Sequence, residues 1–423
     1  MTHIQPFKAV IYNQGKIKDL SRVTCPPYDI ISPERQEYYH KLDPHNLIHI
    51  LLGKDIPGED KYQRAAGYFD TWLTNKILIQ DMQPAIYFYS HQYKIRGERK
   101  VRLGFIARLR LSSQESSVFA HEHTRLEPKE DRLKLLRCVK ANLSPIFIVF
   151  PDEKRMIQRV YEKYIPDNQP FITVVDDDKN CHTLWRLDQP EVLREMSLSM
   201  KDENVFIADG HHRYEVACMY RDEMRKQARP TEEESFNYIM AYFTSAQSRS
   251  LTIFAIHRLV TLPAPFDWGK FKTGLLEYFD IEEIKDKTKF LFLLEKAGGI
   301  EHVLGMYKDK KYYLLRLKNV KILEKMIADK PVEYRQLDVS VLNHIVLHKV
   351  LGMSADDKTN IEFIQDADEL IRRVNEDQGK AAFFLNPVKM SQIMSVALKG
   401  EKMPPKSTYF YPKVLSGLVI NKL

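Results

Sequence analysis

The sequence predicts a fold of the α/β or α+β class, in which helices pack against a β-sheet. Its middle third alternates apolar runs, which are typical of buried strands, with segments whose apolar residues recur at helical spacing. The runs at 145–150 and just before Asp209 predict two strands, and the segments at 131–143 and 216–224 predict two helices. The chain has 423 residues, which at about 100–200 residues per domain allows roughly two to four domains.

Residues 1–261 are expected to form an N-terminal segment and the sheet region. Two prolines in a row keep the chain extended after Cys25, and a serine followed by a proline is a typical helix start. Alternating and aromatic runs around a glycine-containing turn indicate a hairpin. The expected elements are, in order, an extended segment at 25–29, a helix that begins after Ser32, a helix at 62–73, and strands at 84–90 and 101–109 that join at 96–98.

Residues 262–423 are expected to form a second α+β region, which begins at a proline-rich turn. An apolar face at helical spacing and a terminating glycine define its last helix. The tail at 402–413 contains too many prolines for a helix, and it is expected to close on the site. The expected elements are helices at 270–278, 367–374 and 390–397, a hairpin of strands 303–308 and 311–317, and a strand at 381–385.

The composition is that of a soluble globular protein, with 44% hydrophobic and 29% charged residues, and it excludes a wholly disordered or collagen-like chain. The net charge of +7 is small for this length, and acidic residues are interspersed with the basic ones. A dedicated nucleic-acid-binding protein usually has a stripe of Lys and Arg, so no specific nucleic-acid partner is expected. The same small excess of positive charge is compatible with binding of a phosphorylated small molecule.

The four cysteines are spaced too widely for a CxxC pair, so the sequence has neither a zinc knuckle nor a thioredoxin motif. Scattered cysteines are typical of reduced thiols in the cytosol. The N-terminus has no apolar signal core, and no window of about 18 apolar residues predicts a membrane helix. We therefore expect a cytoplasmic protein without a membrane partner.

The strongest functional signal lies between an expected strand and an expected helix, in the run Asp209-Gly210-His211-His212-Arg213. Gly210 permits a tight turn with positive φ, and the helix N-terminus presents free N–H groups to an anion. Arg213 can donate to two phosphate oxygens, His212 can donate or carry a proton, and Asp209 can accept a proton or bind a metal. The alternative is that Asp209 only caps the helix and the histidines lie on the surface.

A second candidate segment is 121–132, which contains HEHT followed by charged residues. His123, Thr124 and Arg132 could donate hydrogen bonds to a phosphate or a substrate. The histidines of this segment could instead bind a metal together with those after Gly210, although zinc usually needs three or four such ligands. The third alternative is a solvated charged loop.

Two further segments carry candidate binding residues. The consecutive prolines can direct Tyr28 and Asp29 into a cleft, or they can form only a rigid surface connection. Lys406 and Ser407 in the C-terminal tail could close over a phosphate, or the tail could be an ordinary polar segment, since the glycines of a phosphate-binding loop are missing. The chain also lacks the GxGxxG motif of dinucleotide-binding folds.

Several motifs together resemble one family along nearly the whole chain. The chain is similar to the family catalogued as domain of unknown function 1015. The motifs that carry the resemblance are QPFKAV at 5–10, CPPYDIIS at 25–32, HEHT at 121–124, EDR at 130–132, ADGHHR at 208–213, LDVSVLNHIVL at 337–347 and MPPKSTYFYPKVLSGL at 403–418.

The turn at 208–213 also resembles the signature turn of the ParB/sulfiredoxin superfamily, in which a strand, a turn and a helix with a His-Arg pair bind phosphate. The resemblance implies a mixed sheet core of that type, elaborated by N-terminal and C-terminal α+β segments. Asp209, His212 and Arg213 match the turn, while His211 stands at the position of the sulfiredoxin cysteine. Reduction of sulfinic acids is therefore not expected.

Around this turn the chain is similar to free-serine kinases, which implies a role in serine biosynthesis. The implied activity is phosphoryl transfer between free L-serine or O-phosphoserine and an adenine nucleotide with Mg²⁺. The alternatives are a ParB-like regulator that binds a nucleotide or a nucleic acid, and a metal-dependent phosphohydrolase. The expected catalytic residues are Asp209, His212 and Arg213, and the expected substrate- or phosphate-binding residues are Gly210, His211, His123, Thr124, Arg132, Lys406, Ser407, Tyr28 and Asp29.

Overall fold

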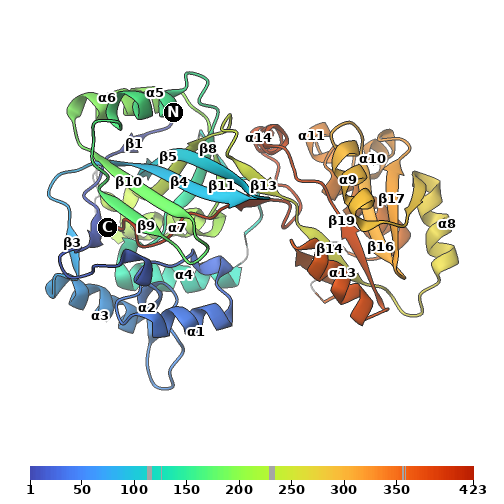
Figure 1. The fold of residues 1–423 in the computed structure, drawn as a ribbon, viewed down its shortest axis with the longest axis horizontal. Helices are drawn as coiled ribbons and strands as arrows, with labels where there is room; N and C mark the ends of the chain where they lie inside the picture. The colour runs from blue at the N-terminus through green and yellow to red at the C-terminus, as the bar shows by residue number, and fades with distance from the viewer. Residues whose placement is uncertain (112–116, 125, 228–233, 355–356, 358) are drawn as a thin grey trace. The chain divides into compact units, whose positions relative to one another are not determined.

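The structure is a computed structural model, and it describes the chain except for residues 112–116, 125, 228–233, 355–356 and 358 (Figure 1). Contacts divide the chain into two compact units, each of which is described by itself. Unit 1 comprises Met1–Ala120, Thr124–Thr252 and Pro412–Leu423, and unit 2 comprises His121–His123 and Ile253–Tyr411.

Most of unit 2 is an insertion in the sequence of unit 1, because the chain leaves unit 1 after Thr252 and returns to it at Pro412. The expected division into a catalytic region up to residue 261 and a C-terminal region from 262 stays a prediction. Across the part of the chain that the structure describes, no helix has the length and the hydropathy to cross a lipid bilayer.

Unit 1 is built on a mixed sheet. Its strands, as far as the described residues show them, are β1 (Ile4–Gln5), β4 (Ile86–Ile95), β5 (Glu98–Arg110), β6 (Val118–Phe119), β8 (Ile146–Phe150), β9 (Ile172–Val175), β10 (Cys181–Leu187), β11 (Val205–Asp209) and β12 (Tyr238–Ser245). The order is β6-β11-β8-β12-β5-β4-β10-β9, with β1 paired to β5. The pair β8 and β12 is parallel, whereas β11 runs antiparallel to β8.

Helices and two small strand pairs complete unit 1. The helices are α1 (Pro33–Leu42), α2 (Ile48–Leu51), α3 (Lys61–Thr74), α4 (Leu126–Val139), α5 (Met156–Tyr164), α6 (Pro190–Met200) and α7 (His211–Gln227), with single turns at Leu20–Arg22, Tyr28–Ile30 and Ser235–Asn237. The strand pairs are β2 (Val10–Tyr12) with β3 (Leu78–Gln80), and β7 (Ala141–Asn142) with β21 (Asn421–Lys422).

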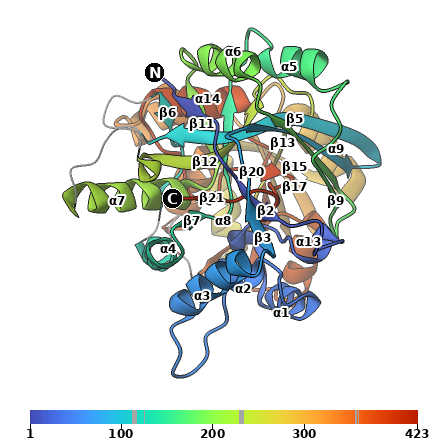
Figure 2. The same cartoon turned by 90° about the vertical axis from the view of Figure 1, so that its left-hand side faces the viewer.

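The two faces of the unit 1 sheet differ in chemistry, because successive residues of a strand point to opposite sides. One face is largely apolar, and Phe105, Ala107 and Leu109 of β5 share a hydrophobic cluster with residues of α5 and α6. Figure 1 shows these two helices along one side of the sheet, and Figure 2 gives the perpendicular view. The opposite face carries Arg102 of β5 against the ring of Tyr242 of β12.

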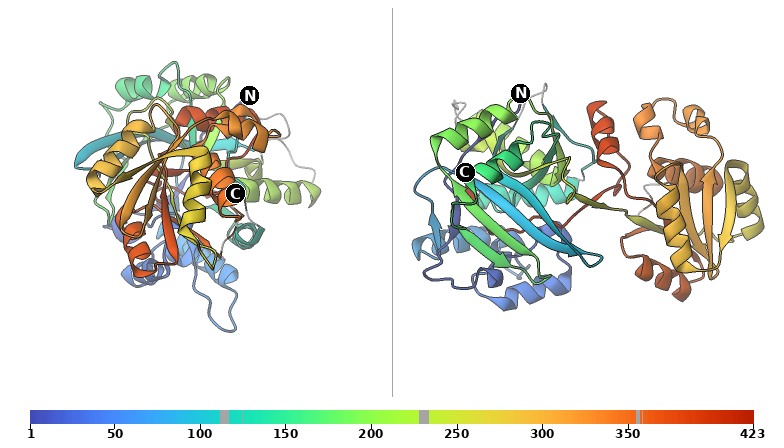
Figure 3. Two further views of the ribbon diagram at one scale, coloured as in Figure 1. Left: turned by 90° about the vertical axis from the view of Figure 1, so that its right-hand side faces the viewer. Right: turned by 45° about the horizontal axis from the view of Figure 1, so that its top comes forward.

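Unit 2 contains an antiparallel sheet with helices beside it (Figure 3). Its described strands are β13 (Thr252–Phe254), which begins at the unit boundary, β14 (His257–Thr261), β15 (Phe279–Ile284), β16 (Val303–Lys308), β17 (Lys311–Leu317), β18 (Ile361–Ile364), β19 (Lys380–Phe384) and β20 (Tyr409–Tyr411). The sheet order is β15-β17-β16-β19-β14-β18. The helices are α8 (Trp268–Tyr278), α9 (Lys287–Ala297), α10 (Lys321–Met326), α11 (Val332–Arg335), α12 (Asp338–Val341) with a π-helical continuation (Leu342–Val350), α13 (Ala367–Glu376) and α14 (Met390–Leu398).

The mixed α/β class is confirmed, and most expected elements are present. The hairpin of β16 and β17 has the expected bounds, and β4 and β5 form the expected hairpin in unit 1. Ser32 caps α1 as expected, because its side chain accepts the N–H of Arg35. The ParB/sulfiredoxin-like identity of the core stays a prediction.

One expected helix has different bounds. The segment at 131–143 was expected to be helical throughout, whereas α4 begins at Leu126 and ends at Val139. Lys140 has a φ of +51°, which ends the helix, and β7 then pairs with β21. A partner distant in sequence therefore determines the end of this helix, and local spacing does not reveal it.

Candidate functional site

The DGHHR segment forms the turn between β11 and α7 in unit 1. Gly210 has a φ of +88°, a conformation that residues with a Cβ rarely adopt. A Cβ at this position would lie 2.9 Å from Cγ2 of Ile146 and 3.0 Å from Cζ of Arg213. The glycine therefore permits both the turn and the close approach of the arginine side chain.

The carboxylate of Asp209 is held between two cations. Nη2 of Arg213 lies 2.7 Å from Oδ2 of Asp209, and Nζ of Lys413 donates to Oδ1. The side chains of Asp209 and Lys413 are only 12% and 9% exposed, so solvent screens this ion pair weakly. Burial alone would raise the pKa of Asp209, but the charges of Lys413 and Arg213 reverse that effect and hold the pKa at about 2.

The pKa of a second carboxylate, that of Asp29, is shifted in the opposite direction. Asp29 lies in the turn Tyr28–Ile30 and is exposed to solvent. Burial among the surrounding protein atoms and the negative charge of Asp209 raise its pKa, while Arg213 and Lys413 oppose the rise. Asp29, Asp209, Arg213 and Lys413 are called the charged cluster below.

A small cavity of about 60 Å³ lies beside the charged cluster. At about 10–15 Å³ per water it has room for a few water molecules or one small polar group, and it is far smaller than the roughly 300–1,000 Å³ of a pocket for a whole ligand. Its polar lining comes from Tyr28, Arg132, Asn142, Ser144 and Arg213, and the remainder of the lining is apolar apart from backbone.

Arg132 supports Tyr28 and has few donors left for a ligand. Its guanidinium lies over the Tyr28 ring, with 4.4 Å between Cζ and the ring centroid. Nη1 donates to the carbonyl of Leu51 at 2.7 Å, and Nε donates to Asp131 at 2.7 Å. The expected phosphate contact of Arg132 stays a prediction, and in this structure the residue fixes the aromatic wall of the cavity.

The remaining candidates are distributed over both units. In unit 1, His211 is buried and its charge lowers the pKa of Asp209, and His212 follows it on α7, partly exposed. Thr124 donates to Glu215 of α7, which also accepts from Lys129 at 3.0 Å. For the alternative of a metal site, the described ranges contain no group of three or more His, Cys, Asp or Glu residues that could hold a metal ion.

Three candidates belong to unit 2, and their part in the site stays a prediction. His123 is exposed there, next to His121, whose Nε2 lies 3.2 Å from Oγ1 of Thr408. Lys406 is exposed with a φ of +54°. The hydroxyl of Ser407 is buried and donates to the carbonyl of Pro404 at 2.5 Å.

Sequence reasoning missed Lys413, although the motif that contains it was noted. The motif at 403–418 has two lysines, and the Ser and Thr that follow Lys406 favour that lysine as the phosphate ligand. Lys413 is the lysine that reaches Asp209, from a position 204 residues later in the chain. The signal that could have found it is the second Pro-Lys pair of the same motif, Pro412-Lys413.

Comparisons with solved structures give only remote likenesses. A free serine kinase in complex with AMP is 12% identical, with a TM-score of 0.33 over 70% of this chain and 83% of that chain. SbnI with a C-terminal truncation from Staphylococcus aureus is 10% identical, with a TM-score of 0.36 over 74% and 86%. A conserved hypothetical protein from Pyrococcus furiosus is 12% identical, with a TM-score of 0.32 over 70% and 87%.

Among curated proteins, no match to the chain was found. The family comparison is more informative, because one family profile spans most of the chain. The matched segment covers residues 4–340, which includes the DGHHR turn and the CPPYDIIS motif. The chain belongs to the family described as protein of unknown function (DUF1015).

Proposed function

We propose that the protein transfers a phosphoryl group between free L-serine and an adenine nucleotide, in either direction. The observation that carries the proposal is the charged cluster at the turn between β11 and α7, where Asp209 holds Arg213 and Lys413 in place. Phosphoryl transfer requires mainly positioning and neutralisation of charge on the transferred group. A preformed pair of cations beside a helix N-terminus suits that requirement.

Arg213 and Lys413 would bind the transferred phosphoryl group. Both side chains are paired with Asp209 in the structure, so they are already oriented before a ligand binds. The first N–H groups of α7, a helix of 17 residues, add donors at the same turn. Mg²⁺ is expected as part of the nucleotide substrate, bound by its phosphate oxygens.

Asp29 is the better general base of the two carboxylates. Two carboxylates whose surroundings move their pKa values apart usually have different roles. Asp209, with a pKa of about 2 and two cations, is a poor proton acceptor, whereas the pKa of Asp29 is raised. In the kinase direction Asp29 would take the proton of the serine hydroxyl while its oxygen attacks the phosphorus and the bond to the nucleotide breaks.

The test is incubation of the purified protein with O-phosphoserine and Mg²⁺, with and without ATP, ADP or AMP. Free serine, inorganic phosphate and nucleotide products are measured together. We expect serine to form only when a nucleotide is present, with the phosphoryl group recovered on the nucleotide product. Phosphate release at the same rate without nucleotide would identify a phosphohydrolase, and no reaction with any nucleotide would exclude the serine assignment.

A variant pair ties the activity to the charged cluster. Arg213→Ala removes one cation from the cluster, and Arg225→Ala removes an arginine of the same helix whose side chain donates to Asn237. We expect Arg213→Ala to lose most of the activity and Arg225→Ala to retain it. Normal turnover by Arg213→Ala would place the phosphate site elsewhere, with the segment at 121–132 as the next candidate.

A further inference from the structure

The last part of unit 1, residues 412–421, runs across the polar face of the sheet and carries Lys413. This segment is called the strap. Its N–H and C=O groups pair with distant segments: Ser416 exchanges backbone hydrogen bonds with Cys25, and Ile420 exchanges them with Val10. The hydroxyl oxygens of Ser416 and Ser144 lie 2.6 Å apart. The strap is therefore an integral part of unit 1.

The strap is also held on both sides of Lys413. Before it, Nη2 of Arg102 donates to the carbonyl of Pro412 at 2.8 Å. After it, the backbone hydrogen bonds between Ser416 and Cys25 fix the strap again, three residues further along the chain.

Arg102 is placed for this contact by an aromatic pocket. It is completely buried on β5, and its guanidinium lies 4.7 Å from the ring centroid of Phe147 and 5.5 Å from that of Tyr242. Gly104, two residues along the same strand, gives the Tyr242 ring its space, since a Cβ there would lie 2.5 Å from Cε2 of that ring. A planar cation between rings can turn only a little, so its donors point in fixed directions.

We propose that Arg102 is a positioning residue for Lys413. By fixing the carbonyl of Pro412, it fixes the backbone from which the Lys413 side chain extends, and so it holds the Lys413 ammonium on Asp209. This inference rests on the proposed function for its enzymatic consequence, since Lys413 matters there as a phosphoryl-binding cation. Its structural content, that Arg102 controls the position of Lys413, can be tested without any substrate.

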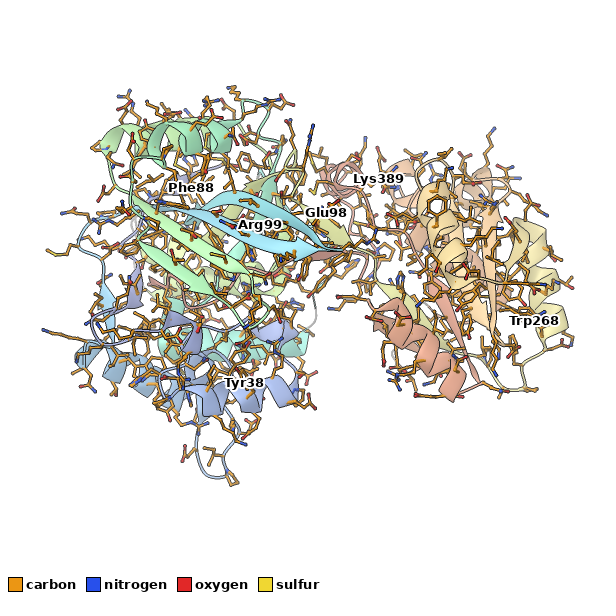
Figure 4. The ribbon with its side chains drawn as sticks, viewed as in Figure 1. Tyr38, Phe88, Glu98, Arg99, Trp268 and Lys389 are labelled. Carbon is orange, nitrogen blue, oxygen red and sulfur yellow. The ribbon has the colours of Figure 1, made fainter. Side chains whose placement is uncertain are left out.

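The first test measures how fast an acylating reagent modifies Lys413, by mass spectrometry, relative to the exposed Lys134 of α4. Arg102→Lys keeps a cation but loses the planar fork, and Arg102→Met removes the cation. Arg99→Lys is the matched control, since Arg99 is an exposed arginine of the same strand (Figure 4). Only a neutral, accessible amine reacts, and one pKa unit alone changes the neutral fraction about tenfold.

We expect Lys413 to react about tenfold faster in both Arg102 variants, with Lys134 and the Arg99→Lys control unchanged. An unchanged Lys413 rate in a folded Arg102 variant would overturn the proposal. If both variants fail to fold, so that all lysines react alike, Arg102 is a structural residue only and the proposal is also wrong.

The second test is kinetic and separates this proposal from the proposed function. With O-phosphoserine and a nucleotide, Arg102→Lys should raise KM more than it lowers kcat, because a displaced Lys413 binds the anion poorly in the ground state. A fast-reacting Lys413 in a protein that does not consume O-phosphoserine would leave the positioning role intact and remove the serine assignment. Normal consumption with a normal KM in Arg102→Lys would remove the positioning role alone.

Discussion

Each compact unit holds one stretch of the C-terminal segment with a fully buried arginine. In unit 1, Arg102 donates to the carbonyl of Pro412 and lies over Phe147. In unit 2, Nη2 of Arg258 lies 3.2 Å from the carbonyl of Pro405 and 3.1 Å from that of Lys406, and its Cζ is 4.5 Å from the ring centroid of Phe363. The chemistry of the two contacts is nearly the same.

The residues that follow the two contacted carbonyls differ in their exposure and in their partners. After Pro412 comes Lys413, which is buried and paired with Asp209. After Pro405 comes Lys406, which is exposed, and then Ser407, whose hydroxyl closes a local turn on Pro404. Arg258 therefore contacts a segment whose next side chains are exposed or locally bonded, while Arg102 contacts the residue before the lysine that pairs with Asp209. A buried arginine that contacts a carbonyl is therefore not by itself evidence of a functional site. The partners of the side chains that follow the contact must be compared as well.

The largest expected effect compares the two lysines. Lys413→Ala should lower kcat/KM for phosphoryl transfer about 10²–10³-fold, the scale seen when one preorganised donor is removed. Lys406→Ala should have a smaller effect, because this lysine has no position in the charged cluster of unit 1. Steady-state kinetics of both variants checks the order. Equal losses would mean that the turn in unit 2 belongs to the catalytic machinery as well.

The next effect compares the two arginines. Arg258→Met leaves the carbonyls of Pro405 and Lys406 without their buried donor, and it should lower the free energy of unfolding by about 2–4 kcal/mol. Burial lowers the pKa of Arg258 to about 9, so at pH 7 the lost group is a cation. Denaturant unfolding measures the loss. The acylation rate of Lys413 should stay at the wild-type value, and an increase would show that the two contacts are not independent.

A third prediction concerns acid pH. The pKa of Asp209 in the folded protein is about 2, below its ordinary value of 3.8, so its charge stabilises the folded state above pH 4, and this stabilisation is lost as the pH falls towards 2. Asp209→Asn should lower the free energy of unfolding at pH 7 by about 2 kcal/mol and flatten the acid limb of the stability curve. Arg258→Met should leave that limb unchanged. Unfolding measured from pH 7 to pH 2 tests both.

The smallest expected effect is a rise in stability. The pKa of Asp29 is raised, so its ionised form is disfavoured in the folded state, and stability increases as the pH falls through that raised pKa. Asp29→Asn should therefore unfold at a slightly higher temperature than the wild type at pH 7, while phosphoryl transfer is lost. A lower unfolding temperature would mean that the carboxylate stabilises the fold, and it would count against its role as the base.

Local sequence patterns predicted the elements that are formed by residues close together in the sequence. The hairpin expected at 303–308 and 311–317 has the observed bounds of both strands, and the serine–proline start of α1 is correct. The DGHHR turn could be anticipated for the same reason, because Gly210 and the strand and helix around it are adjacent in sequence. The contact of Lys413 with Asp209 joins residues 204 positions apart. Local periodicity cannot predict a contact between residues so far apart in the sequence, and the insertion of unit 2 increases their separation.

The strap has a consequence for the order of events during protein synthesis. Residues 1–252 contain Asp29, Asp209 and Arg213, but Lys413 is translated only after the whole of 253–411. At about 5–20 residues per second, that interval lasts roughly 8–30 s. During it, the nascent chain carries the two carboxylates and one cation, with the polar face of its sheet uncovered by the strap. If the charged cluster is the phosphoryl-binding site that we propose, this site is completed only after the inserted unit has been synthesised.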